Sequence, residues 1–152
     1  MRARAILITL ILSLVWAALA QDANIGTWRL NEAKSKLTPG ATKNNTVVYE
    51  ASGDRIKVTI DGIDKNGKPV HNEWTGQFDG KDYPVTGDPT SNARSYTKID
   101  DRTLGFNIKK DGKTTLTGRI VVSADGQFRT VTTVETDAKG KKVSSVLVYG
   151  KE

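Results

Sequence analysis

A single histidine, His71, is the only imidazole available for acid–base or metal chemistry in this 152-residue chain, which contains no cysteine. A Ser-His-Asp triad would need a Gly-x-Ser-x-Gly elbow at a strand-to-helix turn, and the sequence has no such motif. One histidine cannot build a histidine-rich metal site, and the lack of cysteine excludes thiol catalysis and thiolate metal centres. The sequence therefore predicts no metal and no cofactor.

Carboxylates could work as acid–base pairs, but turn chemistry already accounts for most of the aspartates, because Asp in a tight turn hydrogen-bonds its own backbone. Only Glu50, Glu73 and Glu135 lie within expected strands, and no pair among them indicates catalysis. We therefore predict that the protein is not an enzyme; the alternative is an enzyme at the mouth of the fold, for which His71 would be the first residue to replace. The aspartates that we assign to turns are Asp54, Asp64, Asp79, Asp100, Asp111, Asp125 and Asp137.

The chain is basic, with 23 Lys and Arg against 17 Asp and Glu and a formal net charge of +6. A nucleic-acid surface concentrates basic residues beside exposed aromatic side chains. Here the basic residues are spread along the chain in runs no longer than two, such as Lys109-Lys110 and Lys141-Lys142. We therefore predict no nucleic-acid partner and interpret the lysines as a solubility feature of outer strand faces.

The elements that must position these residues are strands. Apolar and polar residues alternate with period two, as in Ile56, Val58 and Ile60, and pairs such as Asp79-Gly80 and Asp111-Gly112 separate the alternating runs. This alternation is typical of antiparallel sheets with one buried and one wet face, joined by hairpin turns. We expect ten strands near residues 25–31, 45–51, 55–62, 69–78, 81–86, 94–99, 103–110, 113–123, 127–136 and 142–150.

Ten short antiparallel strands predict an all-β fold, and an antiparallel up-and-down β-barrel of about ten strands is favoured over the alternative, a two-sheet β-sandwich. Sequential hairpins with few long crossovers suit the barrel, and closure removes an edge strand that would invite aggregation. The longest interruption, residues 31–44, has room for one helical turn at 32–36 before Pro39-Gly40 ends it.

The N-terminus has the pattern of a secretory signal peptide. Arg2 and Arg4 precede an apolar stretch over residues 5–16, and Ala18-Leu19-Ala20 offers small residues at a cleavage site. The apolar stretch is shorter than the roughly 20 residues that a spanning helix needs. We therefore predict a signal peptide at 1–20, one β-barrel domain at 21–152, a secreted or periplasmic location, no membrane span after cleavage, and a monomer.

The opening strand carries a family resemblance. The stretch Ile25-Gly26-Thr27-Trp28-Arg29-Leu30 resembles the first Gly-x-Trp strand of lipocalins and fatty-acid-binding proteins, the calycin barrels. Nearly the whole chain after residue 20 is similar to small exported bacterial lipocalin-like proteins of undefined function, through residues 79–89 and 146–149 in particular.

The resemblance implies a closing role for the first strand. In calycin barrels the tryptophan closes the barrel bottom, and an arginine near the end of the last strand packs over it, so the implied closing residues are Gly26 and Trp28. The last strand here ends in Lys151, and Arg129, one strand earlier, is the candidate substitute for that arginine. No fatty-acid grip is implied, because Leu147-Val148-Tyr149 stands where that family has Arg-x-Tyr.

The large aromatic residues on apparent inner faces have two interpretations. They could simply fill the core, or they could line an apolar pocket with a few polar groups, which is the usual form of a small-molecule site. The first hypothesis is a non-catalytic binding protein for a small apolar or amphipathic ligand; the alternative is an envelope interaction module with a filled core that acts through its surface loops. The candidate ligand-lining residues are Trp74, Phe78, Tyr96, Phe106 and Tyr149.

Overall fold

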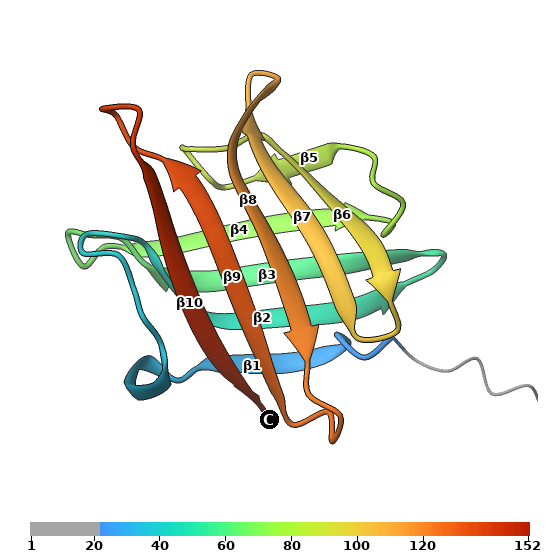
Figure 1. Ribbon diagram of the computed structural model, residues 1–152. Helices are drawn as coiled ribbons and strands as arrows, with labels where there is room; N and C mark the ends of the chain where they lie inside the picture. The colour runs from blue at the N-terminus through green and yellow to red at the C-terminus, as the bar shows by residue number, and fades with distance from the viewer. Residues whose placement is uncertain (1–21) are drawn as a thin grey trace, which may run out of the picture.

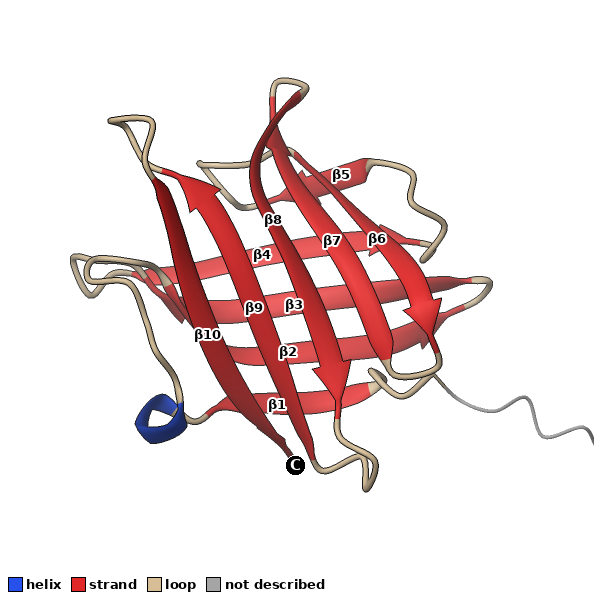
Figure 2. Cartoon of the chain, in the orientation of Figure 1, coloured by secondary structure: helices blue, strands red, loops and turns tan. Residues whose placement is uncertain are grey.

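The computed structural model describes residues 22–152, so the signal peptide predicted at 1–20 lies outside the described residues. The described chain consists of strands joined by short turns, with one 3-10 turn after the first strand (Figures 1 and 2). The elements are β1 (Gly26–Leu30), η1 (Glu32–Lys34), β2 (Lys43–Ser52), β3 (Arg55–Ile63), β4 (Pro69–Gly76), β5 (Tyr83–Thr86), β6 (Ala93–Asp100), β7 (Thr103–Lys110), β8 (Lys113–Val122), β9 (Phe128–Thr136) and β10 (Lys142–Lys151).

The strands form a closed antiparallel barrel. Each strand is hydrogen-bonded to its neighbours in sequence, and β1 closes the cylinder by pairing with β10. Ten strands in up-and-down order confirm the predicted barrel and rule out the two-sheet sandwich. β4 and β5 are shorter than predicted, because residues 77–82 leave the ladder as a connection between them.

Because neighbouring strands are antiparallel, successive connections lie at alternating ends of the barrel (Figure 1). We call the end that carries residues 22–25 and the β2–β3, β4–β5, β6–β7 and β8–β9 connections the packed end. The opposite end carries residues 31–42 and the β3–β4, β5–β6, β7–β8 and β9–β10 connections, and we call it the open end. Residues 31–42 include the predicted helical turn, which forms as η1 with an Asn31 side-chain cap.

The hydrophobic core occupies the half of the barrel near the packed end. Period-two alternation turns every second residue inward, but full burial is reached mainly near the packed ends of the strands. In β8, for example, Ile120 and Val122 are buried whereas Leu116 is only half-buried. The buried apolar residues are Trp28, Val47, Tyr49, Val58, Ile60, Trp74, Val85, Tyr96, Leu104, Ile120, Val122, Val131 and Tyr149.

On β7, β8, β9 and β10 the inward-facing residues near the open end are only half-buried, whereas Val85 of β5 and Arg94 of β6 are buried. Leu116 of β8 lies opposite Glu135 of β9, which in turn lies opposite Val143 of β10, and all three are intermediate in exposure while their outward neighbours are exposed. Val70 and Ile108 are also half-buried. None of these apolar side chains belongs to the set packed against the core. The barrel is therefore filled at one end and accessible to water at the other.

Candidate ligand-binding interior

Four of the five predicted lining residues meet in one aromatic cluster around Tyr96. The Tyr96 ring lies 4.8 Å from Trp74, 5.5 Å from Phe78 and 5.9 Å from Phe106, measured between ring centroids. Trp74 and Tyr96 are buried, whereas Phe78 and Phe106 are half-buried against the core. The edge-to-face geometry of the Trp74–Tyr96 pair is one that aromatic rings prefer.

Phe106 extends across a gap that a glycine leaves. It pairs with Gly118 of β8, and a Cβ atom at Gly118 would overlap the Phe106 ring. The missing side chain therefore lets the ring lie over the β8 backbone, at the level where the filled half gives way to the open half.

Tyr149 lies apart from this cluster. Its hydroxyl donates a hydrogen bond to the carbonyl oxygen of Asn44 at 2.9 Å, which ties the last strand to the start of β2. Burial raises the pKa of Tyr149 to about 12, so the hydroxyl stays protonated. Tyr149 is placed with the arginine of the packed end rather than with the other four aromatic residues.

Three aromatic rings surround Arg129 at the packed end. The guanidinium carbon lies 5.0 Å from the Trp28 ring, 4.9 Å from Tyr49 and 4.9 Å from Tyr149. Trp28 is fully buried, and its Nε1 donates to the Asn24 carbonyl at 2.8 Å. A cation over desolvated aromatic faces is attracted by their quadrupoles, so Arg129 links strands β1, β2 and β10 across the barrel.

Gly26 stands at the edge of the same arrangement. It adopts a φ of 132°, a region that side chains disfavour, and a Cβ there would meet Lys151 Cε at 2.7 Å. Lys151 Nζ in turn lies 5.3 Å from the Trp28 ring. Glycine thus gives the terminal lysine room to lie over the tryptophan beside Arg129.

A second buried arginine, Arg94, lies in the interior, nearer to the open end than Arg129. It is 3% exposed and is the second residue of β6, counted from the open end. Its Nη2 donates to Asn72 Oδ1 at 3.1 Å, and its Nη1 makes a long 3.5 Å contact to the Tyr96 hydroxyl. Its Nε is buried without a hydrogen-bond partner among residues 22–152.

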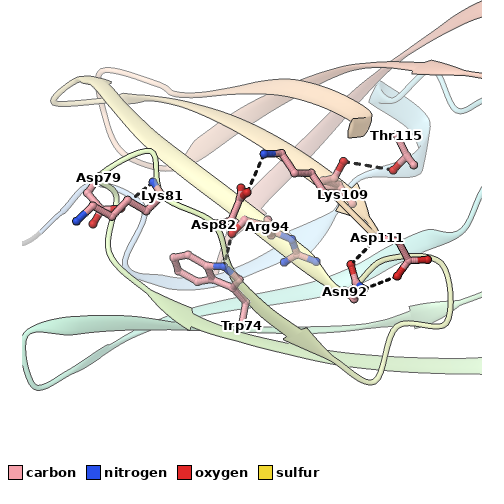
Figure 3. A network of polar contacts seen from close by, with 10 residues as sticks. Trp74, Asp79, Lys81, Asp82, Asn92, Arg94, Lys109, Asp111 and Thr115 are labelled. Carbon is pink, nitrogen blue, oxygen red and sulfur yellow. Dashed lines mark hydrogen bonds and ion pairs between the residues drawn. The ribbon is translucent and has the colours of Figure 1, made fainter. Parts of the chain in front are cut away.

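Sequence reasoning missed Arg94, although a signal was present. Arg94, Ser95 and Tyr96 are consecutive, so a tyrosine assigned to the inner face places the residue two positions earlier on that face as well. Arginine side chains are mostly exposed in folded proteins because of their charge. The tertiary structure instead buries it, and Trp74 Nε1 holds its carbonyl oxygen at 2.8 Å (Figure 3).

The polar groups of the interior continue from Arg94 through two tyrosine hydroxyls. The Tyr49 hydroxyl donates to the Tyr96 hydroxyl at 3.4 Å. Burial, together with the neighbouring Tyr96, holds the pKa of Tyr49 above its usual value, so Tyr49 cannot act as an anionic partner for either arginine. Within the described chain no ion pair involves Arg94 or Arg129.

Both arginines are therefore buried cations that form no ion pair with a carboxylate among residues 22–152. Arginine cannot shed its proton in a protein, so this charge cannot be relieved by a shift in protonation. The charge of Arg94 lowers the pKa of one carboxylate, that of Asp88 in the β5–β6 connection. Its half-burial would raise its pKa, but hydrogen bonds from Ser91 and Thr90, with help from the Arg94 charge, hold that pKa below the usual value.

His71 lies outside the barrel, on the outer face of β4. Its Nδ1 is 2.6 Å from Asp61 Oδ1, and its Nε2 is 3.6 Å from Glu73 Oε1. The side chain is exposed and lies on the opposite face of β4 from Trp74. Within residues 22–152 no group of three or more His, Asp or Glu could hold a metal ion.

Two depressions lie on the outer surface. The larger, about 430 Å³, is bordered by Thr103, Val121 and the acidic β6–β7 connection. The smaller, about 250 Å³, lies between β4 and β5 beside Glu73 and Pro84. Both are shallow, and neither is lined by the half-buried apolar residues of the open half. The half-buried apolar residues of the open half, rather than either surface depression, are therefore the candidate site.

The hairpin connections at the two ends differ in charge. At the open end, residues 63–69, 86–93, 110–113 and 136–142 carry seven lysines and four aspartates, a net charge of +3. At the packed end, residues 52–55, 76–83, 100–103 and 122–128 carry six aspartates, two arginines and one lysine, a net charge of −3. The basic residues that looked evenly spread in sequence thus favour one end, because alternate connections return to the same end.

A closed ten-strand antiparallel up-and-down barrel with one filled and one open half defines the structural class of this protein. No family model matches the chain, and no curated protein matches it. Among the described residues, 22–152, no helix has the length and apolar character needed to span a membrane.

Solved structures similar to this chain include EF1p2_mFAP2b bound to DFHBI, with a TM-score of 0.47 and 9% identity over 86% of this chain and 94% of that chain. Lobster apocrustacyanin A1 has a TM-score of 0.45 and 12% identity over 88% of this chain. Apocrustacyanin C1 has a TM-score of 0.47 and 11% identity over 90% of this chain. The match spans 63% and 64% of the two apocrustacyanin chains.

Proposed function

We propose that the protein is a non-catalytic binding protein for a small apolar or amphipathic molecule, which enters the barrel from the open end. The observation that carries the proposal is the row of inward-facing apolar side chains that stay half-buried and unpacked. Ile108, Leu116 and Val143 face the interior near the open end without joining the core. An apolar ligand would remove this surface from water, which is favourable by roughly 25 cal/mol per Å².

The proposed location is secreted or periplasmic, and the support for it is the signal-peptide pattern at residues 1–20. Small exported domains often rely on disulfides. This chain has no cysteine, and its closed ladder, which leaves no exposed strand edge, stabilises it instead. We also propose that the protein belongs with the small exported bacterial lipocalin-like proteins, which it resembles through residues 79–89 and 146–149.

A neutral lipophilic fluorophore, N-phenyl-1-naphthylamine, tests the proposal without invoking charge. The wild-type protein, residues 21–152, should enhance its fluorescence in a saturable way. Leu116→Lys should weaken this binding at least about tenfold, because it places an ammonium group against the ligand. The matched control is Thr117→Lys, since Thr117 is the exposed outward neighbour of Leu116.

Native mass spectrometry of protein purified from its own host gives the second readout. A bound small molecule that is lost from the Leu116→Lys variant would support the proposal. If neither the fluorophore nor any co-purified molecule binds, the binding function is wrong. The alternative of a surface module, acting through the segments at 31–44 and 86–93, would then take its place.

A further inference from the structure

We propose that the ligand carries an anionic oxygen group and that Arg94 binds this group in the interior. The inference rests on the proposed function and adds the chemical class of the ligand. It starts from a buried cation that forms no ion pair within residues 22–152, since Arg94 is 3% exposed and Asn72 and Tyr96 are its side-chain partners. Asp88 is near enough for the Arg94 charge to lower its pKa, but its carboxylate accepts hydrogen bonds from Thr90 and Ser91.

The guanidinium of Arg94 keeps donor capacity to spare. It has five N–H groups, of which one donates to Asn72 and one lies at long range from the Tyr96 hydroxyl. Nε is buried and has no partner within the described residues. A guanidinium edge of this kind can donate two parallel hydrogen bonds to a carboxylate or phosphate.

Arg94 lies near the open end of β6, beside half-buried apolar residues of the neighbouring strands. Arg94 pairs with Ile108 of β7, Ile108 pairs with Leu116 of β8, and Leu116 pairs with Glu135 of β9. Two apolar residues thus separate the buried cation from the inward-facing, half-exposed Glu135. An amphipathic anion can lay its apolar part against Ile108 and Leu116 while its charged head binds Arg94 and stays away from Glu135.

The charge of the barrel ends is an independent second observation. The lysine-rich connections of the open end attract anions, and the aspartate-rich connections of the packed end repel them. A field of one sign around an entrance raises the local concentration of oppositely charged ligands and their association rate. The same end of the barrel therefore offers the apolar entrance, the attractive field and the unpaired cation.

Arg129 does not compete for this role. Its Nε and Nη1 are also buried without a partner among residues 22–152. Its guanidinium, however, lies within 5.0 Å of three aromatic rings at the packed end, away from the half-buried apolar side chains near the open end. The two buried arginines can therefore be separated by experiment.

The test compares dodecanoate, dodecyl phosphate and 1-dodecanol, which share one alkyl chain and differ in the head. Their dissociation constants would be measured by displacement of N-phenyl-1-naphthylamine at neutral pH. Wild-type protein should prefer the anions to the alcohol, and the tighter of the two anions identifies the head as carboxylate or phosphate. Arg94→Gln should weaken both anions at least about tenfold and change 1-dodecanol less than about twofold, because it removes the charge and keeps a polar side chain.

Two further measurements keep the result independent of folding. Arg94→Lys should retain part of the preference for anions, and Arg102→Gln, an exposed arginine of the packed end, should leave it unchanged. In wild-type protein, the Arg94 Nε–H resonance should shift on addition of dodecanoate and not of 1-dodecanol. Equal affinity for the alcohol and the anions, or equal losses for all three in Arg94→Gln, would overturn the inference alone. No binding of any probe would overturn the proposed function itself.

Discussion

The two ends of the barrel contain the same unusual element, a buried arginine without a carboxylate, in different surroundings. Both have buried N–H groups without a partner among residues 22–152, Nε in Arg94 and Nε and Nη1 in Arg129. Arg129 at the packed end lies among the rings of Trp28, Tyr49 and Tyr149, whereas Arg94 has one amide and one distant hydroxyl. Aromatic faces can stabilise a desolvated cation, so more of the desolvation cost of Arg94 stays uncompensated. Two arginines that are buried to nearly the same degree can therefore have different roles: Arg129 stabilises the fold, whereas Arg94 keeps the capacity to bind a ligand.

The largest expected effect breaks the packed end. Trp28→Ala should lower the free energy of unfolding by about 4 kcal/mol, because it removes a fully buried ring and leaves a cavity. Ile108→Ala, an inward-facing change in the open half, should cost only about 1 kcal/mol, because that side chain is half-buried and unpacked. Urea denaturation of both variants measures the contrast, and equal losses would mean that the two halves are packed alike.

The two arginines give the next largest contrast. Arg129→Gln should destabilise the free protein by about 2 kcal/mol, because it removes a cation from three desolvated ring faces. Arg94→Gln should leave the free energy of unfolding within about 1 kcal/mol of wild type, since it also removes an incompletely paired buried charge. Chemical denaturation without ligand provides the comparison. If Arg94→Gln proves as damaging as Arg129→Gln, Arg94 is a structural residue like its counterpart.

A smaller effect is expected from the charges at the ends. Lys139→Glu combined with Lys142→Glu reverses charge at the open end, and should slow dodecanoate association by about threefold at low salt with little change in the dissociation rate. Lys81→Glu with Arg102→Glu makes the same change in net charge at the packed end. Stopped-flow fluorescence should show that this control leaves the association rate of dodecanoate almost unchanged. Equal slowing by both pairs of substitutions would mean that the effect comes from the total charge of the protein.

The smallest effect concerns His71, on the outer face away from both regions. The hydrogen bond to Asp61 raises the pKa of His71 above its ordinary value of 6.5, and NMR titration of this lone histidine should show it. The pair contributes fully when the pH is below 6.5, and the contribution is lost as the pH rises through the raised pKa. Asp61→Asn should return the pKa toward 6.5 with little change in stability, because the pair is exposed. An unchanged pKa in that variant would contradict the assigned partner.

Local pattern predicted most of the fold. Alternation and Asp-Gly turns placed the strands to within a few residues, and sequential hairpins favoured the closed barrel that the register confirms. The candidate lining residues could be proposed because inward parity is a local property. Whether such residues line a pocket or fill the core depends on their distance from the strands on the other side of the barrel, which the sequence does not give. In the structure, Trp74, Tyr96 and Phe106 pack against one another at the border of the filled half.

The sequence by itself determined the strands and the inward or outward face of most apolar residues, because these follow from a two-residue repeat and from turn chemistry within a few positions. Only the tertiary structure decided which half of the barrel is filled, which arginine meets aromatic rings, and which end collects the lysines. These properties depend on groups such as Trp28 and Arg129, which are far apart in the chain and meet only when β1 pairs with β10. Closure of the ladder is the physical event that turns a repeating pattern into two unlike ends.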